Sequence, residues 1–308
     1  MRRFPCFSAI PLLSTMAASV LAACTFNITS HMHEVVETSD VVFDTVHFDT
    51  ADEAPSLQQA VIVVVGRAGS NATARARLAA LRSPGESSEV LGAGWSFLFA
   101  LRELNVLDLD ITSPSNTDVW LDELMLEVPR SAALDLTVGS HALDVSAMGS
   151  SITASATSGA MTVETTGSLN MRSTSGAMYA QGGEATIESE SGSVDFTVSG
   201  SAHVTTNSGS ISGVMGDGGA VESTSGSINL IVTQPLVEDL RVQSRSGSIG
   251  IAMPNRPCTL VVTSDHGDVS IRIGELVEHG RNVRIDIAGG GPLVQVVTTS
   301  GSVDISDR

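Results

Sequence analysis

The sequence contains no lysine, and all 16 of its basic residues are arginines. They are outnumbered by 34 acidic residues, which gives a formal net charge of −18. Phosphate backbones and anionic lipid surfaces attract clusters of Lys and Arg, and the sequence has no such cluster. The charge pattern therefore argues against nucleic acid as a partner.

Aromatic residues are also scarce, at 4% of the 308 residues, with one Tyr and two Trp. A globular core of this size normally relies on aromatic side chains for much of its buried area. This chain must fill its interior with Val, Ile, Leu, Met and Ala instead. The composition favours a narrow, layered core over a thick, spherical one.

Cysteines and catalytic motifs are equally sparse. The three cysteines are Cys6, Cys24 and Cys258, and we interpret Cys258 as a free buried thiol rather than a reactive one. The sequence contains no Gly-x-Ser-x-Gly elbow, Ser-x-x-Lys pair, phosphate loop or Cys-x-x-Cys pair. We therefore expect no enzymatic activity, no cofactor and no metal site.

Residues 1–23 have the features of a bacterial lipoprotein signal peptide. A basic start is followed by a largely apolar stretch that ends in Leu21-Ala22-Ala23-Cys24. This ending resembles a lipobox, in which the cysteine is lipidated and the leader is cleaved before it. We therefore predict an exported protein anchored to the cell envelope by acyl chains on Cys24. Thr25 favours the outer membrane, and a plain signal peptide is the alternative.

Residues 24–40 are predicted to be a tether, and residues 41–138 to be less regular β coils or a cap. His31 and His33 could bind a metal weakly, but a solvated linker explains them better.

Trp95, Phe97 and Phe99 alternate along one segment and could stack on sugars. The core of wide first coils, or a cap over the open end of a solenoid, is the simpler interpretation.

An internal repeat of the type Ser-Gly-small-aliphatic gives the strongest signal. Its glycines lie mostly about 17 residues apart, and the last spacing of 34 is twice that unit. They are Gly159, Gly176, Gly192, Gly209, Gly226, Gly247, Gly267 and Gly301. A glycine after Ser permits the positive φ that a tight turn needs.

Alignment of the repeats on these glycines indicates two strands per unit. Aliphatic residues stand two and four positions after the glycine and five and seven positions before it, and mostly polar residues lie between them. This alternation is typical of strands with one buried face. Small hydroxyl residues three positions before the glycine are expected to stack as a ladder at the corner of the core.

One such unit cannot bury its apolar face alone, but stacked units bury it against each other. We therefore predict an all-β fold, a parallel β-solenoid (single-stranded β-helix) with roughly 17-residue, two-strand coils, regular over residues 139–308. An antiparallel meander or sandwich is the alternative fold.

The repeat, introduced by Leu126-Glu127-Val128-Pro129-Arg130-Ser131-Ala132, resembles the bacterial DUF4097 family, also named "putative adhesin". The resemblance covers residues 126–308 well and 41–125 loosely. It implies an exported or membrane-attached, adhesin-like protein, and some members are tied to envelope stress. It implies no catalytic residues, and this chain carries Ser or Ala at most positions where members often have Asp.

We hypothesise a non-enzymatic envelope lipoprotein that presents a rigid β-solenoid for adhesion or for binding an envelope protein or glycan. Self-assembly through uncapped terminal strands is one alternative. A polysaccharide-active enzyme is another, and it would need clustered carboxylates, Ca²⁺ and a basic residue. The acids between residues 139 and 230 are scattered instead, which favours a solvated acidic face.

Overall fold

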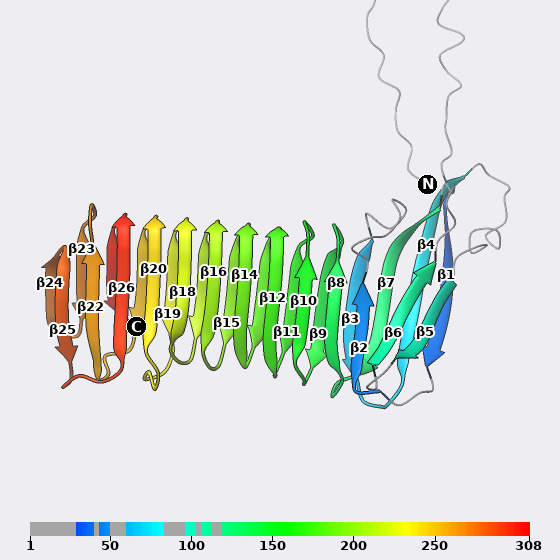
Figure 1. The fold of residues 1–308 in the computed structure, drawn as a ribbon, viewed down its shortest axis with the longest axis horizontal. Helices are drawn as coiled ribbons and strands as arrows, with labels where there is room; N and C mark the ends of the chain where they lie inside the picture. Colours follow the sequence, from blue (N-terminus) through cyan, green and yellow to red (C-terminus); the bar gives the residue numbers. More distant parts are fainter. Residues whose placement is uncertain (1–28, 40–42, 50–59, 83–95, 103–105, 113–118) are drawn as a thin grey trace, which may run out of the picture.

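The computed structural model describes residues 29–39, 43–49, 60–82, 96–102, 106–112 and 119–308. Within these residues every regular element is a β-strand. The strands form a 14-stranded and a 13-stranded sheet, which lie one behind the other and make an elongated rod with its strands across the long axis (Figure 1).

The middle of the rod consists of rungs, each made of one strand from either sheet joined by a turn. Even-numbered strands here belong to the 13-stranded sheet and odd-numbered strands to the 14-stranded sheet. They are β8 (Ala133–Val138), β9 (Ala142–Met148), β10 (Ile152–Ala156), β11 (Met161–Thr165), β12 (Ser168–Ser175), β13 (Met178–Gly182), β14 (Glu184–Ser191), β15 (Val194–Val198), β16 (Ala202–Ser208), β17 (Ile211–Met215), β18 (Gly219–Ser225), β19 (Ile228–Val232), β20 (Leu240–Ser246) and β21 (Ile249–Met253).

These strands pair in parallel and in register, so that equivalent repeat positions lie side by side. Val194, Ile211 and Ile228 are neighbours across three successive rungs. From residue 152 onward, the aliphatic members of the four predicted columns are at most 4% exposed. The predicted parallel β-solenoid is therefore confirmed, and the antiparallel sandwich does not describe the central rungs.

The hydroxyl ladder predicted at the corner of the core is also present. Its members are all buried, with at most 6% exposure. They are Ser173, Ser189, Thr206, Ser223, Ser244, Ser264 and Thr298.

The repeat glycines form a continuous column at the turn within each rung. Gly192, Gly209, Gly226, Gly247 and Gly301 have φ between 142° and 147°, which residues with a Cβ rarely adopt. A Cβ on Gly209 would also overlap the carbonyl group of Gly192 in the adjacent rung. The close approach of successive rungs therefore requires glycine here as much as the turn does.

The C-terminal rung does not follow the order of the chain. The chain passes through β22 (Cys258–Ser264), β23 (Val269–Ile273), β24 (Leu276–Gly280) and β25 (Asn282–Ile287) before it turns back. Then β26 (Leu293–Ser300) lies between β20 and β22, and β27 (Val303–Asp307) lies between β21 and β23. The spacing of 34 residues between Gly267 and Gly301 therefore does not contain another parallel coil. It contains the antiparallel strands β24 and β25, which cover this end of the rod.

The N-terminal end of the rod uses a related arrangement. The first rung, β2 (Thr45–Asp49) and β3 (Val61–Arg67), lies between β8 and β9 on one side and β6 (Val106–Thr112) and β7 (Val119–Pro129) on the other. Parallel pairing therefore extends beyond the predicted boundary at residue 139.

Antiparallel strands cover this end as well. β4 (Ala72–Arg82) pairs with β7, and β5 (Ser96–Arg102) pairs with β6. β1 (Thr29–Ser39) pairs with β4 along its whole length. The stretch 24–40 that we expected to be a tether therefore includes an 11-residue strand, because its backbone completes the edge of the 14-stranded sheet.

The glycine column predicts that the cost of alanine depends on position. Gly209→Ala should lower the free energy of unfolding by roughly 3 kcal/mol or more, because the new Cβ overlaps a neighbouring carbonyl and the φ is unfavourable. Gly69→Ala is the matched control, since Gly69 has φ of 140° but nothing within 4 Å of its Cβ position. It should cost about 1–2 kcal/mol. Urea unfolding measures both, and equal losses would show that the stacked rungs do not constrain this column.

Candidate functional site

A polar groove crosses four strands of the 13-stranded sheet, β10, β12, β14 and β16. It has a volume of about 480 Å³. Since parallel strands lie about 4.8 Å apart, it runs for about 15 Å along the axis of the rod. Its lining residues are Ser155, Ala156, Arg172, Ser173, Thr174, Glu188, Ser189, Glu190, Thr205 and Asn207.

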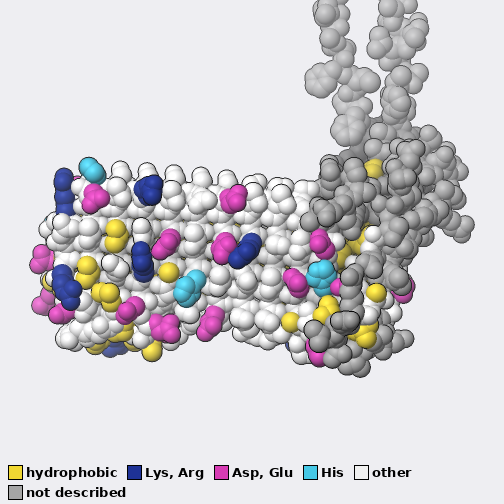
Figure 2. Space-filling model, in the orientation of Figure 1, with side chains coloured by type: hydrophobic (Ala, Val, Ile, Leu, Met, Phe, Trp, Pro, Cys, Tyr) yellow, Lys and Arg dark blue, Asp and Glu magenta, His cyan; other side chains and the backbone are white. Residues whose placement is uncertain are grey.

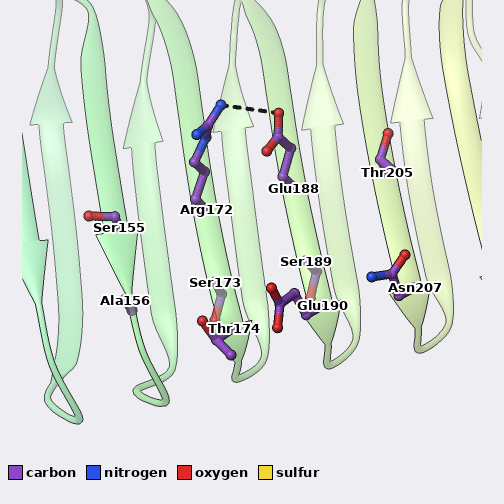
Figure 3. A pocket seen from close by; sticks show the side chains of 10 residues that line it. All are labelled: Ser155, Ala156, Arg172, Ser173, Thr174, Glu188, Ser189, Glu190, Thr205 and Asn207. Carbon is purple, nitrogen blue, oxygen red and sulfur yellow. Dashed lines mark hydrogen bonds and ion pairs between the residues drawn. The ribbon is translucent and has the colours of Figure 1, made fainter.

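Two rows of outward side chains form the walls of the groove, as Figure 3 shows. The first row contains Ser155, Arg172, Glu188 and Thr205, which are aligned because the four strands are in register. The second row contains Thr174, Glu190 and Asn207, two positions further along β12, β14 and β16. Residues two apart in a strand point to the same side, so both rows face outward and leave a channel between them.

The floor of the groove comes from the residues between the two rows, Ala156, Ser173 and Ser189. Ser173 and Ser189 belong to the buried hydroxyl ladder, with 5% and 6% exposure. Their Oγ atoms make no hydrogen bond to the described part of the protein. Because their side chains point into the core, they do not obstruct the channel between the two rows.

One ion pair joins two neighbouring residues within the first row. The Arg172 Nη2 atom lies 3.3 Å from Glu188 Oε1, and the two side chains are 64% and 51% exposed. Such an exposed pair adds little to stability. Together with Glu190 and Asn207 of the second row, it provides both hydrogen-bond donors and acceptors on the two sides of the channel. The groove can therefore recognise a polar ligand that lies parallel to the rod axis.

Elsewhere, charged side chains gather near the N-terminal end, where Arg67, Arg75 and Arg77 form ion pairs with Asp122, Glu123 and Glu127 of β7. Along the middle of the rod, on the face that Figure 2 shows, acidic and basic side chains are scattered. Among the described residues there is no group of three or more His, Cys, Asp or Glu that could hold a metal ion. The scattered acids fit the interpretation of a solvated acidic face.

None of the residues singled out from the sequence is among those that line the groove. Cys24 and Trp95 lie outside the described residues, while Phe97 and Phe99 belong to β5, where Phe99 packs against the core. Cys258 is a free, buried cysteine at the start of β22, and burial raises the pKa of its thiol. No helix in the described part of the chain is long and apolar enough to span a membrane.

Sequence reasoning did not identify the groove. Its polar residues occupy repeat positions that alternate with buried ones, so each of them looks like ordinary strand surface. The only sequence signal is that Arg172 and Glu188 occupy the same repeat position in consecutive units.

A family model described as Toastrack DUF4097 matches residues 108–306. One similar solved structure is named a "putative cell adhesion protein", from Clostridium sporogenes, at 9% identity and TM-score 0.25, covering 90% of this chain and 100% of that one. No curated protein matches the chain.

Two further solved structures are named "putative adhesin". The one from Parabacteroides distasonis has 7% identity and TM-score 0.38, and covers 90% of this chain and 98% of that one. The one from Parabacteroides merdae has 10% identity and TM-score 0.35, and covers 89% and 95%. Likenesses this remote carry no argument about what the chain binds.

One carboxylate outside the groove has a structural role that can be tested by pH. Asp217 Oδ1 accepts hydrogen bonds from the backbone N–H groups of Gly218, Val237 and Glu238, at 2.8, 2.8 and 3.0 Å. Partial burial opposes ionisation of this carboxyl, but the three hydrogen bonds outweigh it and lower its pKa below the usual 3.8. Its contribution to stability is therefore present above pH 3.8 and lost as the pH falls through the lower pKa of the folded state.

We expect Asp217→Asn to lower the free energy of unfolding at pH 7 by about 1–2 kcal/mol, because a charged acceptor is replaced by a neutral one. The difference from the wild type should shrink as the pH falls below 3.8. Asp195→Asn, at an exposed position of β15, serves as the control and should show little effect. Urea unfolding at a series of pH values tests this, and a difference that persists at low pH would contradict it.

Proposed function

Because the chain belongs to the Toastrack DUF4097 family, we propose that it is an exported, non-enzymatic envelope lipoprotein whose rigid β-solenoid binds a ligand at the cell surface. The polar groove across β10, β12, β14 and β16 carries the binding part of this proposal. The sequence Leu21-Ala22-Ala23-Cys24 carries the anchoring part. A link to envelope stress is implied by the family alone.

An anchor on Cys24 would hold the rod by one end. The first described strand, β1, lies at one end of the rod, and β24 and β25 lie at the other (Figure 1). With strands about 4.8 Å apart, the 13-stranded sheet is about 60 Å long. The groove lies between the two ends, so an anchored rod could hold it away from the lipid surface.

The solenoid gives the groove a fixed shape before any ligand arrives. Each of its four strands is hydrogen-bonded on both sides by parallel neighbours. The backbone under the groove therefore loses little conformational entropy on binding. Rigid presentation of this kind suits a binding protein.

The lining favours a glycan as the ligand over a protein. Protein interfaces usually depend on buried aromatic or apolar anchors, and Ala156 is the only apolar residue that lines the groove. A linear glycan offers hydroxyl groups at regular intervals, which match donors and acceptors repeated from strand to strand.

The anchoring part predicts lipidation at a single residue. Cells that express the full chain should incorporate labelled palmitate, and Cys24→Ala should abolish the label while the leader remains uncleaved. Membrane fractionation of both forms provides the second measurement. Equal labelling of the wild type and the variant would refute the anchor.

The binding part predicts that the ion pair in the groove contributes to glycan binding and that a similar ion pair outside the groove does not. With the mature chain made soluble by Cys24→Ser, Arg172→Ala should weaken binding to oligosaccharides released from cell envelopes by about tenfold, because a charged hydrogen-bond donor is lost. Arg241→Ala is the matched control. Arg241 pairs with Glu222 at 3.5 Å on the same sheet but outside the groove, and its loss should leave binding unchanged.

Binding is measured on an array of these oligosaccharides and by calorimetry. If the wild type retains envelope proteins but no glycan, the proposed ligand class is wrong. Turnover of uronate polymers in the presence of Ca²⁺ would contradict the non-enzymatic role. The soluble form should keep residues 29–39, since they form β1.

A further inference from the structure

The rung formed by β26 and β27 fills a gap between rungs that precede it in the chain. β26 pairs with β20 on one side and β22 on the other, and β27 pairs with β21 and β23 in the same way. The chain therefore skips one rung after β21, builds the next one from β22 and β23, and later returns to fill the gap. Figure 1 shows this rung (red) between rungs coloured yellow and orange.

The inserted rung completes the core as well as the two sheets. Five of its side chains are buried to 1% exposure or less, namely Val294, Val296, Thr298, Val303 and Ile305. Without this rung, the edges of β20, β21, β22 and β23 would face a gap one rung wide. Unpaired parallel edges beside an open apolar core form a strong binding site for a matching pair of strands.

In the described chain, this rung is joined to the rest of the solenoid through one short connection, residues 288–292. Ala288, Gly289 and Gly290 all have positive φ, of 49°, 95° and 81°. A Cβ on Gly291 would lie 2.8 Å from the carbonyl oxygen of Pro257, so the connection passes closely over the start of β22. The turn back into the gap therefore needs an uncommon backbone conformation and a tight crossing.

We propose that β26 and β27 can be exchanged between two copies of this chain, so that each copy fills the gap of the other and a reciprocal dimer forms. The contacts made in the gap are the same in both arrangements, because the donated strands and the receiving edges have identical sequences. Only the conformation of residues 288–292 differs. Exchange of an identical element in this way is a low-cost route to a dimer with twofold symmetry, and a strained hinge favours it.

A cross-link between two differently marked copies tests the exchange. Arg241 and Gln295 are neighbours in β20 and β26, and both project from the outer face of the sheet. Mature chains with Cys24→Ser are made as Arg241→Cys in one copy and Gln295→Cys in a tagged copy. The two are mixed in denaturant, refolded together at high concentration and treated with a short bismaleimide. Exchange should give a covalent product that contains one copy of each kind.

The control places the cysteines in two strands that the proposal leaves within one chain. Arg172 and Glu188 are neighbours in β12 and β14, so Arg172→Cys and Glu188→Cys on separate copies should give no product between chains. The double variant Arg241→Cys/Gln295→Cys should cross-link within one chain at low concentration. If the separate Arg241→Cys and Gln295→Cys copies give no product between chains, or no more than the control pair gives, the proposal is wrong.

The hinge provides an independent variant. Gly289→Ala should raise the dimer fraction several-fold, because the turn back into the gap holds this residue at φ of 95°, which a residue with a Cβ rarely adopts, while nothing lies within 4 Å of its Cβ position. Gly69→Ala, which has φ of 140° and equally open space but lies far from the hinge, should leave the dimer fraction as in the wild type. Sedimentation velocity after refolding measures the fraction. A Gly289→Ala chain that folds and stays as monomeric as the wild type would overturn the role of the hinge.

Discussion

The spacing of about 4.8 Å between parallel strands in register governs this structure. It brings each repeat position into contact with its equivalents on two sides, so a residue type suited to one rung suits them all. At the turn, the spacing places the carbonyl of one repeat glycine where a Cβ of the next would lie, as at Gly192 and Gly209. In the core it stacks aliphatic side chains into columns and leaves little room for aromatic rings, which explains why they are so few.

The same spacing gives the outer surface its recognition properties. The backbone positions of Arg172 and Glu188 stay adjacent, because both strands are held by neighbours on either side. Rows of outward side chains on the 13-stranded sheet therefore start from fixed backbone positions, and inward-facing residues such as Ser173 and Ser189 lie under the channel between two rows. The proposed function of the groove rests on this fixed arrangement and needs no moving part.

Much of the fold could be predicted from the sequence, because burial in a repeated strand leaves a period of two around a fixed glycine. Val194, Ile211 and Ile228 could be assigned to one buried column without any structure. The position of the β26–β27 rung in the sheets could not be predicted, since the alternation of apolar and polar residues in β26 would be the same wherever the strand was inserted. β1 was misread because His31 and His33 suggest a solvated segment, while its pairing with β4 depends on backbone atoms. The groove required knowledge of two rows at once, and pattern analysis treats each position separately.

Near each end of the rod, inside the antiparallel strands that cover it, lies one rung that is out of chain order. β2 and β3 lie between strands formed later in the chain, and β26 and β27 lie between strands formed earlier. Each of these four strands has a partner on both sides, so none of them can be lost from an end as the last strand of a simple coil would be. Under the proposed export from the N-terminus, the core would not be complete until β26 and β27 had crossed the membrane. The open gap alone would then distinguish an interrupted rod from a finished one for a protease.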